Sequence, residues 1–279
     1  MNFRQFAQRY IKLLRSRQKV SSRYFTSAPS PQNALDIFKG EWWSRLPGSF
    51  SQLRAGEIRT FEDPRIAWAL SEFGSVEGQS VLELGPLEAG HSYMLERAGF
   101  ASVTAIEANP RAYLRCLIVK EITGLTRTRF LAGDFVEYLR AAPSRFDAVI
   151  ASGILYHLAN PVELIALLSR VTGRLFLWTH YYDAVLISHK PKTAASFTGE
   201  DQIDYEGFSA QLFRQQYGRS FGMRRFCGGS RPHSHWMRRE DILACLRHFG
   251  FTEIRIGFEE PDHASGPAFA LVAMNQTGS

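Results

Sequence analysis

Short apolar runs alternate with segments of helical spacing through the middle of the chain. Apolar runs bounded by turn residues predict strands, and apolar residues at intervals of three and four predict helices. The expected strands are Ser80–Leu84, Ser102–Glu107, Arg129–Ala132, Phe146–Ala151 and Arg174–Thr179, and the expected helices start near Gly90, at Pro110 (ending near Gly124) and at Pro161, with Asn160 as its cap. This alternation predicts a parallel sheet with helices on both faces.

The two ends of this pattern add a helix and a hairpin. In "EDPRIAWALSEFG" Asp63 can cap a helix, Pro64 suits its first position and Gly74 follows its end. Near the C-terminus a helix over Arg238–Phe249 precedes strands over Thr252–Phe258 and Ala268–Met274, which the short segment "EEPDHASGP" can join only as a hairpin. The predicted fold class is therefore α/β, with a Rossmann-like, seven-stranded sheet that is parallel except for a C-terminal antiparallel hairpin.

The same pattern divides the chain into four parts. Residues 1–60 form a basic, helical N-terminal arm and extension, and residues 61–182 form the ligand-binding core. Residues 183–236 interrupt the alternation and are rich in Phe, Tyr, Gly, Arg and His, so we expect an insertion that covers the carboxyl edge of the sheet. Residues 237–279 supply the helix and hairpin that complete the core.

Basic charge is confined to the start of the chain. The formal net charge is +6, but residues 1–35 hold seven basic residues and no acidic one, which leaves 26 basic against 27 acidic residues elsewhere. The charge of the body therefore gives no argument for nucleic-acid binding, and any affinity for RNA is expected in the arm. The arm also carries apolar residues at helical spacing, namely Phe3, Phe6, Tyr10, Leu13 and Leu14. It could be a membrane-surface helix, an RNA-contacting arm, a transit peptide or a helix that packs on its own domain.

Cysteine content and hydropathy limit the cellular setting. Cys116, Cys227 and Cys245 form no CxxC pair and are odd in number, which suits a reducing compartment and argues against a cysteine-based zinc site. No apolar run approaches about 18 residues, so no stable membrane insertion is expected. A cytoplasmic location is predicted, and the oligomeric state stays open.

Acidic residues stand at the expected carboxyl ends of three strands, where open α/β sheets bind ligands. Glu107 can accept hydrogen bonds from both hydroxyls of a ribose, and Asp134 with a neighbouring amide can read adenine. The turn after the first strand has Pro86, without an N–H, and Glu88, with a negative charge, so it suits phosphate poorly. These features favour an adenosine ligand that carries positive charge. Alternatively, Asp134 could cap a helix, Glu107 lie at a solvated strand end and Glu83 pair with an arginine.

Four motifs carry a family resemblance: "VLELGPLEAGHS", "VTAIEANP", "LAGDF" and "FDAVIASGILYHLANPVELI". They resemble the successive motifs of class I S-adenosylmethionine-dependent methyltransferases over roughly Ser80–Thr179. The resemblance implies S-adenosyl-L-methionine as cofactor and a binding site formed by Glu83, Gly85, Pro86, Gly90, Glu107, Ala108, Asp134, Phe135, Ser152 and Gly153. Among these, Glu83, Gly85 and Gly90 surround the methionine part, Glu107 holds the ribose, Asp134 and Phe135 hold the adenine, and Ser152 lies near the sulfonium. The sequence departs from the family at Leu87, where glycine is usual.

Candidates for catalysis and acceptor binding follow the fourth and fifth strands. A base within reach of the acceptor assists methyl transfer to a hydroxyl or a protonated amine; the candidates are His157, His180 and Tyr156. The candidate acceptor contacts are Tyr181, Tyr182, His233, His235 and Trp236, and the arginines that could clamp an anionic acceptor are Arg219, Arg224, Arg225 and Arg231. His233 and His235 with His180 and Asp183 make only a weak metal-site pattern, so no metal is predicted.

Four functional interpretations follow. The leading one is a methyltransferase acting on an oxygen or nitrogen nucleophile of a small molecule. The second is a methyl- or carboxymethyltransferase acting on tRNA or another RNA, because "GILYH" is similar to the corresponding segment of relatives that place a carboxymethyl group on the tRNA wobble uridine. The third is a nicotinamide-dependent oxidoreductase, which the missing middle glycine and the terminal hairpin disfavour. The fourth is a cofactor-binding scaffold that has lost catalysis.

Overall fold

The structure, a computed structural model, describes residues 24–223 and 226–275. The helix expected in the N-terminal arm, and Arg224 and Arg225, lie outside the described residues.

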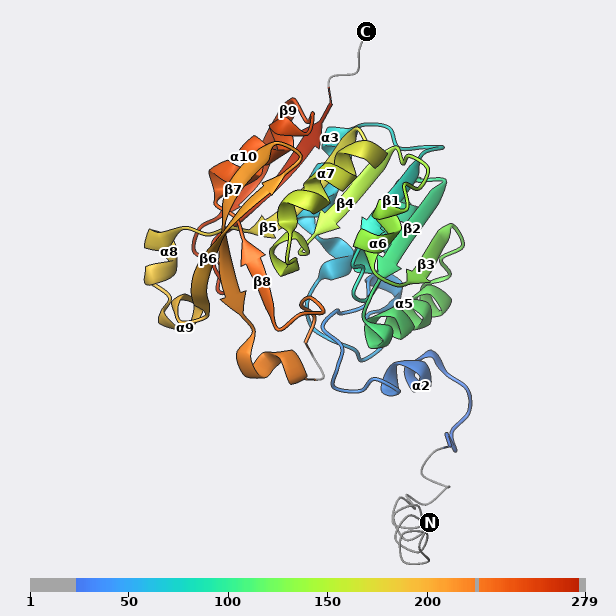
Figure 1. Cartoon of the computed structure of the whole chain (residues 1–279). Coiled ribbons are helices and arrows are strands. Elements are labelled where there is room, and N and C mark those ends of the chain that lie inside the picture. The colour runs from blue at the N-terminus through green and yellow to red at the C-terminus, as the bar shows by residue number, and fades with distance from the viewer. Residues whose placement is uncertain (1–23, 224–225, 276–279) are drawn as a thin grey trace, which may run out of the picture.

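A seven-stranded sheet forms the centre of the molecule, in the order β3-β2-β1-β4-β5-β10-β9 (Figure 1). Its strands are β1 (Ser80–Leu84), β2 (Ser102–Glu107), β3 (Thr128–Ala132), β4 (Ala148–Ser152), β5 (Arg174–His180), β9 (Glu253–Glu260) and β10 (Ala268–Met274). Strands β1 to β5 are parallel, and β10 pairs antiparallel with both β5 and β9. The predicted fold class is confirmed, and strand ends differ from the prediction by one or two residues at β3, β4, β5 and β9.

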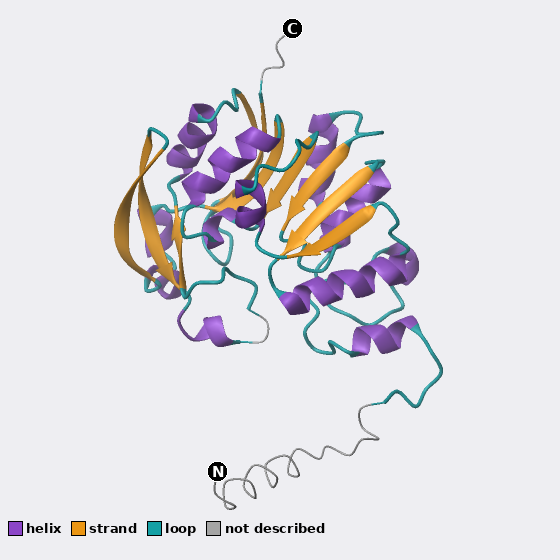
Figure 2. Ribbon diagram, turned by 45° about the vertical axis from the view of Figure 1, so that its right-hand side comes forward, coloured by secondary structure: helices purple, strands orange, loops and turns teal. Residues whose placement is uncertain are grey.

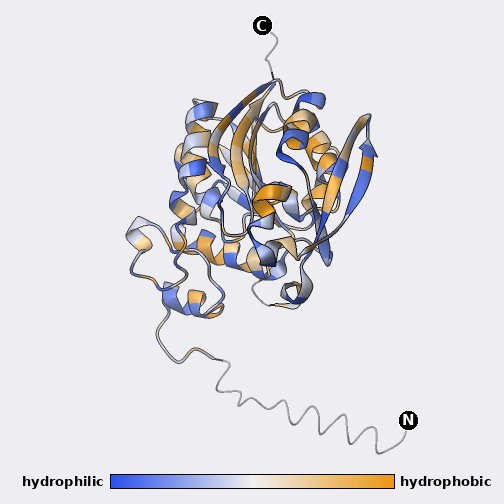
Figure 3. Ribbon diagram, turned by 90° about the vertical axis from the view of Figure 1, so that its left-hand side faces the viewer, coloured by the Kyte–Doolittle hydropathy of each residue, from blue (hydrophilic) through white to orange (hydrophobic). Residues whose placement is uncertain are grey.

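Helices cover both faces of this sheet (Figure 2). They are α3 (Pro64–Phe73), α4 (Gly90–Ala98), α5 (Pro110–Thr123), α6 (Phe135–Arg140), α7 (Pro161–Val171) and α10 (Arg239–His248). Successive strand residues point to opposite faces: Leu82 packs with α6, α7 and α10, whereas Val81 packs with α3 and α4. Hydrophobic residues gather between the layers in Figure 3, so most of the core is formed by the sheet and its helices. The predicted caps Asp63 and Asn160 both accept hydrogen bonds from their helices.

The N-terminal extension (residues 24–62) packs on the edge of the core beside α5. It contains α2 (Pro31–Asp36) and the short 3-10 turns η2 (Gly48–Phe50) and η3 (Thr60–Glu62). Its buried residues share a cluster with α5, β2 and β3; these extension residues are Leu35, Phe38, Trp42, Leu46 and Phe61. Within the extension Ser44 forms an isolated parallel β-bridge with Ile58. A Cβ on Gly56 would lie 2.1 Å from the backbone of Trp43. Glycine at this position allows the two chain segments to touch.

The insertion forms a second sheet that the sequence pattern did not predict. After α8 (Ala184–Ser188) and α9 (Pro191–Ala194), strands β6 (Phe197–Tyr205), β7 (Phe208–Gln216) and β8 (His233–Trp236) form an antiparallel sheet. Residues of β7 pack with α7 and α10 in the main core. The segment between β7 and β8, which contains η5 (Gly218–Gly222), returns toward the central sheet. Only part of the insertion therefore reaches the carboxyl edge that we expected it to cover.

Candidate active site

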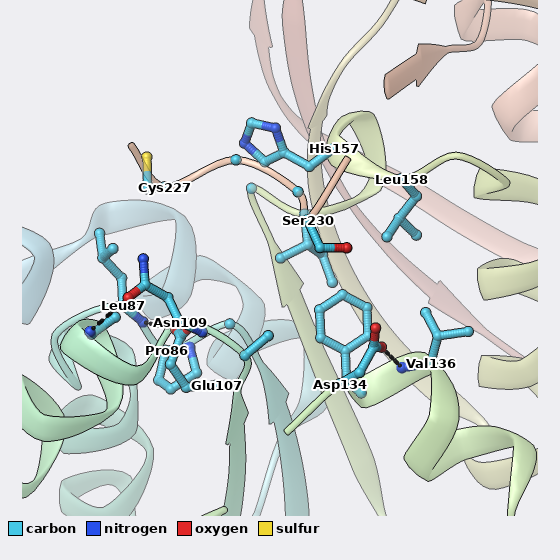
Figure 4. Close-up of a pocket in the computed structure, with 18 of the residues that line it drawn as sticks. Pro86, Leu87, Glu107, Asn109, Asp134, Val136, His157, Leu158, Cys227 and Ser230 are labelled. Carbon is cyan, nitrogen blue, oxygen red and sulfur yellow. Dashed lines mark hydrogen bonds between the residues drawn. The ribbon is translucent and has the colours of Figure 1, made fainter. Parts of the chain in front are cut away.

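A cavity of about 630 Å³ lies at the carboxyl ends of β1, β2, β3 and β4. Eleven of the residues predicted for the site line it: Gly85, Pro86, Gly90, Glu107, Ala108, Asp134, Phe135, Ser152, Gly153, Tyr156 and His157. In Figure 4, Leu87, Glu107 and Asn109 lie on one side of the cavity, Asp134 and Val136 lie on the other, and the segment with Cys227 and Ser230 passes over it. We call this segment, Cys227–Arg231, the strap.

The turn after β1, residues 85–90, uses its own amides internally. Gly85 donates its N–H to Ile106, and Leu87 donates to Glu107 at 3.1 Å. Glu88 and Ala89 both donate to the carbonyl of Pro86, which has no N–H itself. A pyrophosphate needs several outward-facing amides in such a turn. The loop is therefore unsuited to a dinucleotide.

Left-handed backbone angles shape this loop. Gly85, Leu87 and Ala89 have φ values of +66°, +54° and +62°. Such angles favour glycine, since a Cβ crowds the backbone there. Leu87 thus occupies a position where glycine would be unstrained. This explains in physical terms why glycine is usual where this sequence has leucine.

Glu107 joins β2 to the loop while facing the cavity. Its Oε2 accepts from the Leu87 amide at 3.1 Å and its Oε1 from the Asn109 amide at 2.8 Å. The side chain is 8% exposed, and burial raises its pKa above the ordinary glutamate value. Because each carboxylate oxygen has two acceptor sites, both oxygens keep capacity for a ligand hydroxyl. The solvated strand end that was the alternative for Glu107 does not occur.

Asp134 combines both roles that the sequence left open. Its Oδ1 caps α6 by accepting the Val136 amide at 2.7 Å. The residue is exposed at the cavity, and its Oδ2 accepts no hydrogen bond from the described residues. Asp134 can therefore cap the helix and present an acceptor to a ligand.

Glu83 lies beneath the cavity and is not one of the described residues that line it. It is 2% exposed and accepts a short hydrogen bond from the hydroxyl of Ser92 in α4. Burial raises its pKa. The partner is thus a hydroxyl, not the arginine considered as an alternative, and the carboxyl holds the first turn of α4 against β1.

The charge of Glu88 is not presented to a ligand as the sequence argument assumed. The side chain is 1% exposed, forms an ion pair with Arg115 (Nη1–Oε1 3.0 Å) and accepts the amides of Trp43 and Ser44. Glu88 is one of the residues that line the cavity, but its carboxylate is occupied by Arg115 and the extension. The poor fit to phosphate comes instead from the occupied amides of the loop.

Tyr156 and His157 belong to η4 (Leu155–His157), directly after β4. Both line the cavity, and the rings lie 4.1 Å apart between centroids. His157 Nδ1 is 2.8 Å from the hydroxyl of Tyr217, and its carbonyl lies against Gly229 of the strap, where a Cβ would approach to 2.4 Å. Burial lowers the pKa of His157 to about 3 and raises that of Tyr156. His157 is therefore a neutral group that supports the strap.

His180, predicted as a possible base, is not among the described residues that line the cavity. Its Nδ1 lies 2.9 Å from the carbonyl of Gly266, and its ring stacks on Trp236 with a centroid distance of 5.1 Å. Burial lowers its pKa to about 4. The pairing of His180 with Ala268 places it where β10 covers β5, so the geometry gives it a structural role.

The predicted acceptor contacts that follow β5 or lie on β8 are also not among the described residues that line the cavity. Tyr181 packs edge-on against Phe269, and Tyr182 stacks on Phe213 at 3.6 Å. His235 bonds to Asp201 and to the carbonyl of Ala159. Together with His233 and Trp236, these residues join the insertion to the core. None of the five lines the cavity: Tyr181 packs in the main core, and the side chains of Tyr182 and His235 contact the second sheet.

Among the residues that the structure describes, no three His, Cys, Asp or Glu side chains are arranged as a metal site. Of the predicted arginines in this part of the chain, Arg231 lines the cavity and Arg219 does not. The described lining also includes Ser44, Thr60 and Cys227, which sequence reasoning did not select. For Thr60 the signal in the sequence is Gly90, because a Cβ at that position would lie 2.5 Å from Thr60 Oγ1. A glycine in a sequence does not show which residue lies against it, so this signal could not identify Thr60.

The comparisons with known proteins agree with this geometry. A family model described as a methyltransferase domain matches residues 82–175, which span β1 to the start of β5 and carry most of the cavity. Residues 82–175 are therefore a methyltransferase domain, in agreement with the resemblance of the motifs to class I S-adenosylmethionine-dependent methyltransferases. The nicotinamide-dependent alternative is not supported.

The relatives of this chain include a tRNA U34 carboxymethyltransferase of Chromohalobacter salexigens, 31% identical over 91 residues. That match covers 32% of this chain, and the chain matches only 27% of the relative's length. Among solved structures, the N-terminal domain of EvdMO1 with SAH bound has a TM-score of 0.67 at 22% identity, over 88% of this chain and 95% of that one. Magnesium protoporphyrin IX methyltransferase from Synechocystis PCC 6803 with bound SAH has a TM-score of 0.52 at 17% identity, over 77% and 81%. At these identities the solved structures establish the fold of the chain and no more.

The helices within residues 24–223 and 226–275 are all too short or too polar to cross a bilayer.

Proposed function

We propose that this protein transfers the methyl group of S-adenosylmethionine to an oxygen or nitrogen nucleophile of a small molecule bound beneath the strap. The observation that carries the proposal is the cavity itself: the carboxyl ends of adjacent strands supply Glu107 and Asp134. In the loop after β1, Gly85, Leu87, Glu88 and Ala89 all donate their amides within the protein, which disfavours a pyrophosphate. A cavity of about 630 Å³ is in the range that small-molecule sites occupy.

The order of the strands supports the following arrangement of the cofactor. Asp134 Oδ2 can accept a hydrogen bond from the edge of adenine, and the backbone beside Phe135 can donate one. Glu107 can accept both ribose hydroxyls, as carboxylates at this position of nucleotide-binding sheets do. Gly85, Pro86 and Gly90 then surround the amino-acid end, and Ser152 and Gly153 lie near the sulfonium. When bound, S-adenosylmethionine supplies an activated methyl group, so the protein has mainly to orient the acceptor and exclude water.

Tyr156 and the strap form the acceptor side of the site. Tyr156 lines the cavity after β4, and Arg231 brings a positive charge to the strap. His157, neutral and bonded to Tyr217, holds the strap in place. With a pKa of about 3 His157 is a weak base, so we propose a positioning role for it and assign contact with the acceptor to Tyr156.

An RNA acceptor is the second candidate. It is favoured by the match to the tRNA U34 carboxymethyltransferase over 91 residues and by the basic composition of residues 1–35. An RNA acceptor requires binding that weakens steeply with salt. A cytoplasmic location accords with either acceptor and with the three cysteines, all of which are free of disulfides.

The test is a calorimetric titration of the whole chain with S-adenosylmethionine and S-adenosylhomocysteine, followed by acceptor screening with a labelled methyl donor. We expect micromolar binding of both ligands and methylation of a small molecule. Binding of a nicotinamide dinucleotide with no heat from either adenosyl ligand would contradict the proposal. Salt-sensitive labelling of RNA, without labelling of small molecules, would select the second candidate.

A further inference from the structure

His91 is a lining residue of the cavity that sequence reasoning did not select. It is the second residue of α4, and its side chain is 16% exposed. Nε2 of its ring lies 3.0 Å from Oδ2 of Asp63, the residue that caps α3. Nδ1 makes no hydrogen bond with any residue in the described part of the chain and is not among its fully buried polar atoms. One ring nitrogen is therefore held by the protein, and the other is left for a ligand.

Asp63 determines which nitrogen of His91 carries the proton. Burial disfavours the ionised form of Asp63, but the hydrogen bonds from His91 and Arg65 outweigh burial and hold the pKa of this carboxyl well below its ordinary value. An ionised carboxylate can only accept hydrogen bonds, so Nε2 of His91 must be the donor. In the neutral ring the nitrogen without a proton is then Nδ1, which is the nitrogen that can take one up.

The charged groups around His91 suit a ring that gains and loses a proton. Among the described residues, Asp63 and Arg65 face it from α3, and Glu83 lies close to it from β1. Burial raises the pKa of Glu83, and the charge of His91 opposes this shift more than any other group. Asp63 can stabilise the imidazolium that forms when Nδ1 is protonated. Arg65 binds the same carboxylate at 2.7 Å and so keeps Asp63 in place.

The contacts of α3 place His91 at the end of the cavity where Tyr156 lies. Helix α4 follows β1 and Tyr156 follows β4, and these two strands pair with each other. Arg65, the other partner of Asp63, lies over the ring of Trp178 at 4.4 Å, and Trp178 meets Tyr156 edge-on with 6.1 Å between the ring centroids. The groups assigned to adenosine lie at the ends of β2 and β3, on the other side of β1. His91 therefore belongs to the acceptor side of the site.

The other candidate bases in the described lining are occupied or unsuited. His157 Nδ1 is 2.8 Å from the Tyr217 hydroxyl, and burial lowers the pKa of His157 to about 3. Burial raises the pKa of Tyr156, so its phenol keeps its proton at neutral pH. Three lining glutamates form ion pairs with arginines, namely Glu88, Glu137 and Glu163.

We propose that His91 is the catalytic base of methyl transfer and that Asp63 is a positioning residue that keeps Nδ1 of His91 free of a proton. The inference rests on the proposed function and narrows the acceptor to a group that must lose a proton, a hydroxyl or a protonated amine. As a hydroxyl oxygen bonds to the methyl carbon, the carbon–sulfur bond breaks and its electron pair stays on sulfur, which leaves S-adenosylhomocysteine. The hydroxyl proton passes to His91 Nδ1 and later to water. A protonated amine gives its proton to Nδ1 before its nitrogen attacks.

The first measurement is the tautomer of His91, by nitrogen NMR of the whole chain labelled in its histidines, in mildly alkaline buffer. The His91 signals are those missing from His91→Gln, whose amide can still donate to Asp63. We expect the wild type to carry the proton on Nε2. Asp63→Asn keeps an oxygen for the cap of α3 but turns an N–H toward His91, so the proton should move to Nδ1. Asp183→Asn is the control, because Asp183 caps α8 and does not line the cavity.

A wild-type ring with its proton on Nδ1 would overturn the inference, since that nitrogen could not then accept one. An unchanged tautomer in Asp63→Asn would overturn the role of Asp63. Melting temperatures report whether each variant folds, and if Asp63→Asn does not, the wild-type tautomer and His91→Gln decide.

The second measurement is methyl transfer from labelled S-adenosylmethionine to the phenols, alcohols and amines of the acceptor screen. His91→Gln should lower kcat at least about 100-fold, as expected for loss of a general base. Asp63→Asn should lower it in the same way, whereas Asp183→Asn and His189→Gln, which replaces an exposed histidine outside the cavity lining, should match the wild type.

Calorimetric titration separates this role from cofactor binding. The affinity of His91→Gln for S-adenosylhomocysteine should equal that of the wild type. A loss of affinity with kcat unchanged would show that His91 binds the cofactor and would overturn the inference. If the wild type has the expected tautomer but methylates no small molecule, the result counts against the proposed function and not against the placement of Nδ1.

Discussion

The backbone amide of Leu87 donates a hydrogen bond of 3.1 Å to Glu107 Oε2, which fastens the loop after β1 to the tip of β2. The other carboxylate oxygen of Glu107 accepts the amide of Asn109 at 2.8 Å. One buried carboxylate thus fixes the chain on both sides of the cavity floor and still faces the cavity. Loop geometry and ligand binding are therefore coupled through Glu107.

Glu107→Ala should weaken S-adenosylhomocysteine binding by at least about tenfold, because hydrogen bonds to a charged group each contribute about 1.5–3 kcal/mol. Glu107→Gln keeps one acceptor oxygen and should fall between the alanine variant and the wild type. Calorimetric titration measures both, with the exposed Glu77→Ala as a control for loss of a carboxylate. Wild-type affinity in the alanine variant would contradict a role for Glu107 in the site.

The raised pKa of Glu107 gives the cofactor affinity a pH dependence. Burial shifts this pKa above the ordinary value of 4.5, so the carboxyl gains a proton at a higher pH than an exposed glutamate. Protonation turns an acceptor oxygen into a donor and removes acceptor capacity for the ribose. Affinity should therefore begin to fall while the pH is still above 4.5. Calorimetric titrations of the wild type and Glu107→Gln at a series of pH values above 4.5 test this prediction. The affinity of the glutamine variant should not fall with the protonation of residue 107, because glutamine does not titrate.

The central sheet could be predicted because its strands are short apolar runs whose residues are buried on both faces, as Val81 and Leu82 are. The insertion could not. Strand β6 is polar at most positions, with the sequence FTGEDQIDY, and β8 has only four residues, His233–Trp236. Their pairing with β7 is decided by tertiary contacts that no local pattern encodes.

The acids of the site could be predicted because each follows a strand, whereas other residues depend on contacts distant in sequence. Ser44 is held at the cavity by the hydrogen bond from its amide to Glu88, 44 residues away, and Thr60 by its close approach to Gly90, 30 residues away. His180 follows a predicted strand in the same way as His157, yet its pairing with Ala268 of β10 buries it away from the cavity. Position after a strand thus identifies candidates for the site, and the neighbouring strand decides whether a candidate reaches the cavity.

Leu87→Gly should leave stability equal or raise it by up to about 1 kcal/mol. A left-handed non-glycine residue costs about 1–2 kcal/mol, and the backbone entropy of glycine costs about 0.5–1 kcal/mol in return. Leu87→Val should destabilise the protein because a β-branched side chain fits φ = +54° worse. Urea denaturation measures both. As a comparison, Leu114→Gly in α5 should cost about 1 kcal/mol; equal losses at both positions would refute the strain at Leu87.

Glu88 and Arg115 should show strong coupling in a double-mutant cycle. Both are buried, so removing one partner leaves an uncompensated charge and should cost about 3–5 kcal/mol. Arg115→Met leaves Glu88 with only the amides of the extension, and Glu88→Gln leaves Arg115 without its anion. The double variant should recover part of the loss. Denaturation of all four proteins gives the coupling energy, and additive losses would mean that the pair does not act as a unit.

His157 should make the folded protein less stable as the pH falls. Its pKa is about 3 when folded, against an ordinary value of 6.5, so the unfolded chain binds a proton that the folded protein does not. Stability is therefore fully present above about pH 6.5 and declines toward pH 3, with a slope approaching about 1.4 kcal/mol per pH unit.

The measurement is urea denaturation at pH 7 and pH 5 for the wild type and His157→Phe. The wild type should lose more stability between these pH values than the variant, because phenylalanine cannot take up a proton. His189→Phe, which replaces an exposed histidine outside the cavity lining, controls for the change of residue type. Tyr217→Phe adds a second arm: it removes the partner of His157 Nδ1 at 2.8 Å and should loosen the strap, raising KM for the acceptor more than it lowers kcat. Equal pH sensitivity in the wild type and His157→Phe would show that His157 is charged in the folded protein, and its positioning role would then have to be replaced by one in which it exchanges a proton.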